Sequence, residues 1–251
     1  MLGELIHRIG DTTVYLTLSY YRAVLFTSLC ILNIFNPRNY NSEIFTHLMT
    51  QLHQTSIKVM PQFIMLAAIF GSIVIGLVIV IASDFSVQIQ VGSLIVTFVV
   101  NEFAPLLTAF FIAYRFSTRI HKHATSIHFD SEIQLLHNLI IPRILSTLLS
   151  TMTLSILFSM IMIVSGYLSV FFILGMDLHT YKHLVFSSLS VQNIFILLVK
   201  SSLFGFTVAV VALYNGLHVL KPKHNTSKIF VILFFIEFLS LFIQKALDAI
   251  Q

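Results

Sequence analysis

Residues 99–115 read VVNEFAPLLTAFFIAYR. The stretch is apolar enough for the interior of a membrane, yet it contains an acidic residue, Glu102, and a proline, Pro105. A carboxylate in hydrocarbon costs at least about 3 kcal/mol, and a proline removes a backbone hydrogen bond from a helix. A membrane span that carries both residues is predicted to contain a polar and irregular place.

The composition of the whole chain is that of an integral membrane protein. The chain has 251 residues, of which 57% are hydrophobic and 10% are charged, whereas a soluble domain carries about 25% charged residues. The 11 histidines form no HExxH or similar motif, and a single cysteine, Cys30, does not match a metal cluster. We therefore expect no metal site and no cofactor. The net charge of +4 is too small to indicate nucleic-acid binding.

Five apolar regions are candidates for membrane spans, since a spanning helix needs about 20 mostly apolar residues. They cover residues 63–82, 93–113, 144–174, 193–214 and, over a shorter length, 229–243. The sequence therefore predicts an all-α integral membrane protein with five transmembrane helices. It contains no P-loop, GxSxG or HExxH motif, so we expect a transport or scaffold component that is not an enzyme.

The first sixty residues combine an amphipathic start, an apolar stretch and a polar stretch. Apolar residues among 2–9 recur at helical spacing, and the apolar stretch 14–35 contains Arg22 and several tyrosines. Arginine and tyrosine suit the level of the lipid headgroups, so we favour an interfacial helix there over a sixth span. The polar stretch 36–58 is expected to be a linker. We thus divide the chain into an N-terminal part, 1–58, and a five-span membrane domain, 59–251.

Lysine and arginine residues predict the orientation, because cytoplasmic loops are enriched in them. If the N-terminus lies in the cytoplasm, Lys182 and Lys245 are the only lysine or arginine residues placed outside, and Lys200 lies within a span. Segment 115–143 is then a cytoplasmic connection between the second and third spans. It is either a docking site for a soluble partner or an ordinary solvated loop.

Three ionisable residues fall inside the predicted spans: Glu102, Lys200 and Glu237. Charges inside membranes usually pair and face the protein interior or a water-filled cavity, so we expect Glu102 to pair with Lys200. The pair either lines a cavity for a lipid headgroup or locks two helices together. Pro105 is expected to kink its helix one turn after Glu102. Glu237 is expected to be either a neutral carboxyl or a lumen-facing one.

Four segments of the chain resemble those of one transporter family. GSLIVTFVVNEFAPLLTAFFIAYR, at 92–115, resembles the signature of MlaE-type permeases, the membrane subunits of Mla/Mce ABC transporters. FGSIVIGLVIVI at 70–81, IIPRILS at 140–146 and VKSSLFGFTVAVVALYNGL at 199–217 agree with further family segments, in the same order. The similarity covers about residues 60 to 217.

The resemblance implies a permease that transports phospholipid. Such a permease works as a homodimer, with two copies of a separate cytoplasmic ABC ATPase subunit and an Mce-domain protein on the far side of the membrane. The family has an interfacial N-terminal helix and five spans, in agreement with the hydropathy. Either the inner membrane of a Gram-negative bacterium or the plastid inner envelope would be its location, with the N-terminus in the cytoplasm.

The resemblance also assigns positions. Glu102 and Pro105 match the Glu and Pro of the family's ELGP motif, Lys200 matches the Lys of its IKS motif, and Asn101 replaces an Arg. Together with Glu237, these residues are the predicted substrate cavity. Segment 119–136 corresponds to the cytoplasmic coupling helix that meets the ATPase. The candidate coupling residues are Arg119, His123, His128, Asp130 and Glu132.

Other functions remain as alternatives. The chain is either such a permease, a diverged inactive copy, or a membrane scaffold that recruits partners without transporting anything. An ion-coupled secondary transporter would work without an ATPase, but the sequence shows none of the inverted repeats often found in that class.

Overall fold

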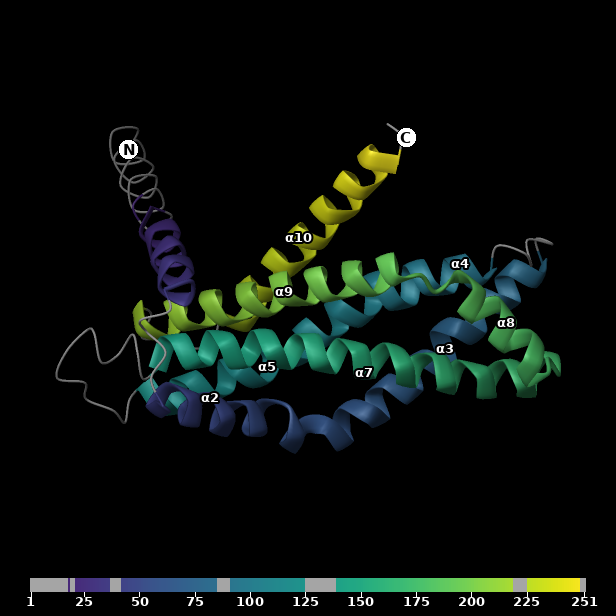
Figure 1. Ribbon diagram of the computed structural model, residues 1–251, viewed down its shortest axis with the longest axis horizontal. Coiled ribbons are helices and arrows are strands. Elements are labelled where there is room, and N and C mark those ends of the chain that lie inside the picture. Colours follow the sequence, from purple (N-terminus) through teal and green to yellow (C-terminus); the bar gives the residue numbers. More distant parts are fainter. Residues whose placement is uncertain are drawn as a thin grey trace, which may run out of the picture.

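The structure, a computed structural model, describes residue 18 and residues 21–36, 42–84, 91–124, 139–218 and 225–248. All elements in these residues are helical (Figure 1). In chain order they are a helix at Tyr21–Ile34, α2 (Ser42–Thr55), the 3-10 helix η2 (Ile57–Val59), α3 (Met60–Asp84), α4 (Val91–Ile95), the π-helix η4 (Val96–Phe103), α5 (Ala104–Ala124), α7 (Ile141–Leu174), α8 (Leu178–Ser188), α9 (Val191–His218) and α10 (Asn225–Asp248).

The predicted all-α membrane fold is confirmed. Four helical segments of the described residues are long and apolar enough to cross a membrane: Ile44–Ile81, Gly92–Arg115, Ile141–Ile173 and Val191–Asn215. Each overlaps one of the first four predicted spans, and the first begins at Ile44, earlier than the predicted start at residue 63. The fifth predicted span is α10, whose 24 residues form a helix about 36 Å long. That length suffices for a hydrocarbon core of about 30 Å, and the crossing by α10 stays a prediction.

The N-terminal part differs from the expected linker. Residues 42–55 form helix α2, which continues through η2 into α3 and packs against α7. Ile44 and Leu48, one helical turn apart, are buried, and the Ser56 hydroxyl donates a hydrogen bond to the Ser150 hydroxyl at 2.8 Å. A polar stretch with one apolar stripe is therefore helical because α7 covers that stripe.

The helix at Tyr21–Ile34 leaves the bundle on the same side as α10 (Figure 1). The amphipathic pattern of residues 2–9 lies outside the described residues. The interfacial location of the N-terminal helix, and the division of the chain at residue 58, stay predictions.

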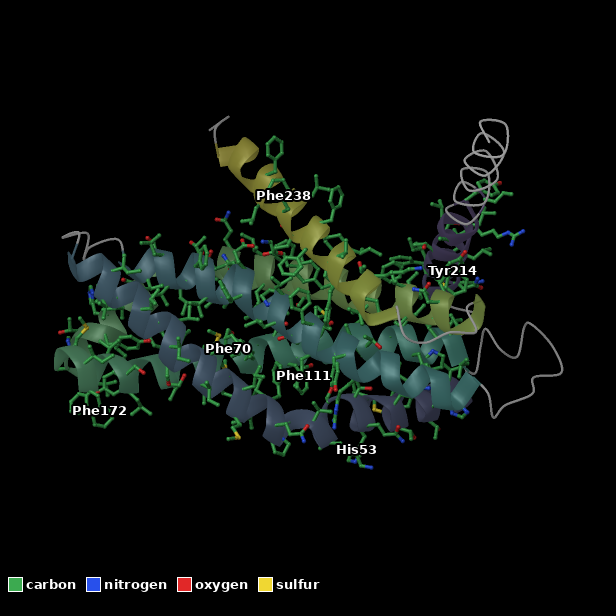
Figure 2. All side chains as sticks on the ribbon, turned by 180° about the vertical axis from the view of Figure 1, so that it is seen from behind. His53, Phe70, Phe111, Phe172, Tyr214 and Phe238 are labelled. Carbon is green, nitrogen blue, oxygen red and sulfur yellow. The ribbon has the colours of Figure 1, made fainter. Side chains whose placement is uncertain are left out.

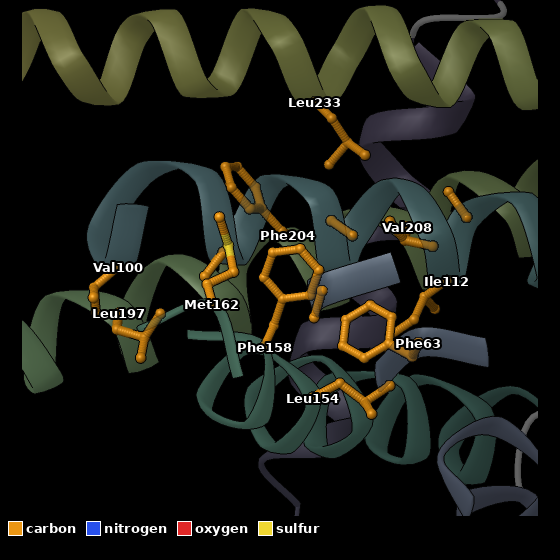
Figure 3. Packing of buried hydrophobic residues seen from close by; sticks show 14 of the residues in the cluster. Phe63, Val100, Ile112, Leu154, Phe158, Met162, Leu197, Phe204, Val208 and Leu233 are labelled. Atoms are coloured by element: carbon orange, nitrogen blue, oxygen red, sulfur yellow. The ribbon is translucent and has the colours of Figure 1, made fainter. Parts of the chain in front are cut away.

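The bundle has an aromatic centre. The ring of Phe63 on α3 lies 5.1 Å from that of Phe111 on α5 and 5.0 Å from that of Phe158 on α7, measured between centroids. Figure 3 shows Phe63 and Phe158 in the middle of the packed side chains, with Leu233 of α10 directed toward them. These contacts join α3, α5, α7 and α10 into one core.

The outer surface of the bundle is also apolar. Phe172 near the end of α7 and Phe238 on α10 point away from the bundle (Figure 2) and are 79% and 71% exposed. A soluble monomer rarely exposes large contiguous apolar surfaces. The arrangement suits a protein whose surroundings are lipid chains or other membrane subunits.

Small residues bring α3 and α7 into close contact. A Cβ atom on Gly71 of α3 would lie 2.5 Å from the Met162 Cα and 2.3 Å from the Ser165 Oγ of α7. A Cβ on Gly166 of α7 would lie 2.6 Å from the Ile75 Cδ1. Packing through small residues is the usual way in which membrane helices approach each other, because lipid offers no hydrophobic driving force between them.

The turn between α7 and α8 is built by a glycine and an aspartate. Gly175 ends α7 with a φ of +64°, a conformation that other residues rarely adopt. The Asp177 carboxylate then accepts hydrogen bonds from the backbone N–H groups of His179 and Thr180 at the start of α8. The hydrogen bonding with Thr180 lowers the pKa of Asp177, so this cap weakens when acid protonates the carboxylate.

Because α3 lies so close to α7, an alanine is expected to destabilise the fold at Gly71 of α3 but not at Gly76. Gly71→Ala places a methyl group against the α7 backbone and is expected to lower the free energy of unfolding by about 1–3 kcal/mol. Gly76→Ala is the matched control, because its nearest neighbour atom would lie at an ordinary 3.5 Å. Thermal unfolding in detergent measures both variants. Equal melting temperatures for the two variants would contradict this account of the interface.

Candidate functional site

The second span is irregular at the place where the sequence predicted it to be. Residues 96–103 form the π-helix η4, and the Ala104 N–H donates to the Val99 carbonyl, five residues back. Pro105 follows directly, buried in the first turn of α5. A proline has no N–H to donate, and its ring presses on the carbonyl four residues earlier. The wide π-turn is therefore placed where the regular ladder is interrupted, and such turns are frequent at functional sites.

Three charged side chains meet beside this π-helix. We call Glu102, Lys200 and Glu237 the charged cluster. The Lys200 ammonium donates to Oε2 of Glu102 and lies 3.9 Å from Oε1 of Glu237. The three residues come from η4, α9 and α10 and are only 6–7% exposed. The predicted pair of Glu102 with Lys200 is thus present in the structure, and Glu237 joins it.

The charged cluster has more acceptors than donors. Oε1 of Glu102 and both carboxylate oxygens of Glu237 accept no hydrogen bond within the described part of the chain. A buried acceptor without a donor costs about 1–3 kcal/mol. The cluster therefore offers places for additional donors, such as water, a proton or an ammonium group, and its lysine could turn to an anionic group.

Asn101 takes part in a different polar contact. It is 1% exposed, and its Nδ2 donates to Oδ1 of Asn193 on α9 at 3.1 Å. Nδ2 of Asn193 in turn donates to the Ser188 carbonyl at 3.0 Å. The chain of amides connects the π-helix to the junction of α8 and α9. Sequence reasoning did not single out Asn193, although an amide at the start of an apolar run was a usable signal.

The structure separates the predicted coupling residues from the charged cluster. Arg119 and His123 belong to the last turns of α5, at the end of the bundle where α7 begins (Figure 1). His128, Asp130 and Glu132 lie outside the described residues. Within the described ranges, no group of three His, Cys, Asp or Glu side chains could hold a metal ion.

A cavity of about 620 Å³ lies between α7, α8, α9 and the π-helix. Its lining is almost wholly apolar and includes none of the charged cluster, although Val100 and Leu197 are close to the cluster along the chain. Within this protomer the charged cluster is thus enclosed by protein. The cluster is a buried polar centre beside an apolar cavity.

The amino-acid sequence is similar to those of transport proteins. Residues 48–230 match the sequence model of a family described as Permease MlaE. Relatives described as probable ABC transporter permease proteins come from Rickettsia conorii, with 23% identity, and Rickettsia prowazekii, with 22% identity. Each alignment spans 225 residues and covers 86% of this chain and 85% of the relative.

Removing the lysine of the charged cluster alone is expected to destabilise the fold more than removing the lysine together with its partner Glu102. Lys200→Met leaves two buried carboxylates without a cation and is expected to lower the free energy of unfolding by about 3–5 kcal/mol. Glu102→Gln combined with Lys200→Gln removes the pair as a unit and is expected to cost less than Lys200→Met alone. Thermal unfolding of the purified protein measures both, and Lys58→Met, at an exposed position, controls for the loss of a lysine. If Lys200→Met and Lys58→Met melt alike, the cluster does not stabilise the fold.

Proposed function

Because the chain belongs to the MlaE permease family, we propose that it is the membrane subunit of an ABC transporter that moves phospholipid between membranes. The observation that carries the proposal is the buried pair of Glu102 and Lys200, which lies inside the family match at residues 48–230. Burying charged side chains within a membrane costs free energy. In a transporter of charged headgroups, such a pair could bind the headgroup. The chemical work of ATP hydrolysis belongs to a separate cytoplasmic subunit.

The permease is proposed to act as a homodimer, with the phospholipid between the two protomers. When the protomers separate on the outer side, the Lys200 ammonium exchanges Glu102 for the phosphate of a headgroup. The oxygens of Glu102 and Glu237 that accept no hydrogen bond can accept one from the amine of a zwitterionic headgroup. The exchange gives the phosphate a cation and the headgroup amine a carboxylate, so that the cost of burying the headgroup charges is partly offset.

Force from the ATPase is proposed to enter through segment 119–136. Residues 119–124 of this segment are the last residues of α5, which begins directly after the π-helix that carries Glu102. A shift of the cytoplasmic end of α5 would therefore reach the charged cluster along one helix. An Mce-domain protein is the proposed partner on the outer side, where α8 lies.

The proposed location follows from the same family membership and from the charge distribution. The relatives reported above are bacterial, which supports the inner membrane of a Gram-negative bacterium over a plastid envelope. The N-terminus is proposed to lie in the cytoplasm, as the lysine and arginine residues indicate.

Transport is expected to depend on the charge of Lys200. Glu102→Gln with Lys200→Gln should reduce lipid transfer by the reconstituted transporter at least about tenfold, because the neutral side chains cannot exchange a carboxylate for a phosphate. Lys58→Gln is the control for a lysine outside the cluster. Transfer of a fluorescent phospholipid between vesicles, driven by ATP, measures the rate. A neutral double variant that assembles and transports at the rate of the unmodified protein would favour a cluster with a structural role alone.

Assembly with the ATPase is expected to depend on the cytoplasmic end. Replacing Arg119, His123, His128, Asp130 and Glu132 together by alanine should abolish co-purification of the ATPase subunit. Replacing His179, Lys182 and His183 of α8 by alanine is the control at the opposite end of the bundle. If the ATPase is retained by the first variant and lost by the second, the assignment of the cytoplasmic end is wrong.

A further inference from the structure

The cavity between α7, α8, α9 and the π-helix is a second candidate binding site. Its volume of about 620 Å³ falls within the roughly 300–1,000 Å³ of small-molecule sites. Its lining includes Val100, Ser159, Tyr181, Lys182, Phe186 and Leu197. We call this cavity the α7–α8 groove.

The interior of the α7–α8 groove suits hydrocarbon. The Tyr181 hydroxyl donates to the Ile163 carbonyl at 2.8 Å, and the Ser159 hydroxyl donates to the Ile156 carbonyl at 2.9 Å. These hydroxyl donors are thus used within the protein. Apolar cavities of this kind hold apolar molecules in preference to water, since a water molecule needs two to four polar partners.

A single positively charged side chain, that of Lys182, lies at the edge of the groove. Lys182 is the only charged residue in its lining, its side chain is exposed, and it forms no ion pair with any residue that the structure describes. It lies on α8, at the end of the bundle where α7 gives way to α9 (Figure 1). A lysine at a membrane interface extends its stem along apolar surface and keeps its ammonium at headgroup level. An apolar groove with a cation at its edge is complementary to an anionic amphiphile.

We propose that the α7–α8 groove binds one acyl chain of an anionic phospholipid, whose phosphate contacts the Lys182 ammonium. The groove extends from Lys182 to Val100 and Leu197, and it does not include Glu102, Lys200 or Glu237. The bound lipid is therefore distinct from a lipid held at the charged cluster between protomers. This site requires only the location of the chain in a membrane and is independent of transport.

The absence of tryptophan from the chain makes the occupant of the groove measurable. Phe186→Trp places a single reporter in the groove lining, at a position that is 61% exposed. Phe195→Trp is the matched control, because Phe195 on α9 is 66% exposed and does not line the groove. Each variant is placed in phosphatidylcholine vesicles that contain a small fraction of brominated phosphatidylglycerol or brominated phosphatidylcholine. Bromine quenches tryptophan fluorescence on contact.

The expected result is selective quenching in the groove. The Phe186→Trp variant should respond to brominated phosphatidylglycerol at about one fifth of the concentration needed for brominated phosphatidylcholine. The Phe195→Trp variant should respond to the two lipids equally. Adding Lys182→Gln to the Phe186→Trp variant should remove the preference, and adding Lys58→Gln should leave it unchanged.

Two results would overturn the proposal. Equal quenching of the Phe186→Trp variant by the two lipids, unaffected by Lys182→Gln, would mean that the lysine selects no headgroup. If neither lipid quenches the Phe186→Trp variant while both quench the Phe195→Trp variant, protein covers the groove, for example a second copy of the chain. Neither result would change the expectation for the transport assay, because that assay tests the charged cluster and not the groove.

Discussion

The ion pair between Lys200 and Glu102 is the interaction around which the membrane helices are arranged. Removing two such charges from water costs several kcal/mol for each ion, and this cost is offset only when the pair stays together with good geometry. The partners lie 98 positions apart in the chain, so the pair fixes the π-helix against α9. Glu237 extends the same constraint to α10, which otherwise projects from the bundle (Figure 1).

The π-helix makes this arrangement possible. Pro105 interrupts the regular hydrogen-bond ladder, and the wide turn before it carries Glu102 toward α9 and Asn101 toward Asn193. Two neighbouring polar residues thus serve two contacts on one partner helix. The same segment provides Val100 to the wall of the α7–α8 groove. One irregular turn therefore lies between an enclosed charged centre and an apolar cavity.

Much of the fold could be predicted from the sequence, because long apolar runs have few alternatives in a membrane. The positions of the first four spans follow from hydropathy, although the first helical segment begins at Ile44, well before the predicted start at residue 63. The pairing of Glu102 with Lys200 was predictable as well, since a lone charge in hydrocarbon requires a partner of opposite sign. Helix α2 was not predicted, because its single apolar stripe becomes meaningful only when α7 is present to cover it.

The remaining features depend on three-dimensional arrangement. Glu237 joins the charged cluster because α10 packs against α5 and α9, and no local pattern states that contact. The π-helix differs from an α-helix in the width of its turn, and Pro105 marks its end without specifying that width. The α7–α8 groove arises from the shapes of several helices together. Sequence patterns predict the helices and indicate that buried charges will pair. The cavities depend on how the helices pack together, which the patterns do not state.

The most direct test of the central claim is a charge exchange at the pair. Glu102→Lys and Lys200→Glu, made singly and together, form a double-mutant cycle, with the free energy of unfolding in detergent as the measured quantity. Each single variant places like charges in contact and is expected to be strongly destabilised, whereas the double variant restores an opposite pair and should recover at least about 2 kcal/mol relative to the sum of the singles. Additive losses, with no recovery in the double variant, would contradict the claim that this contact organises the bundle.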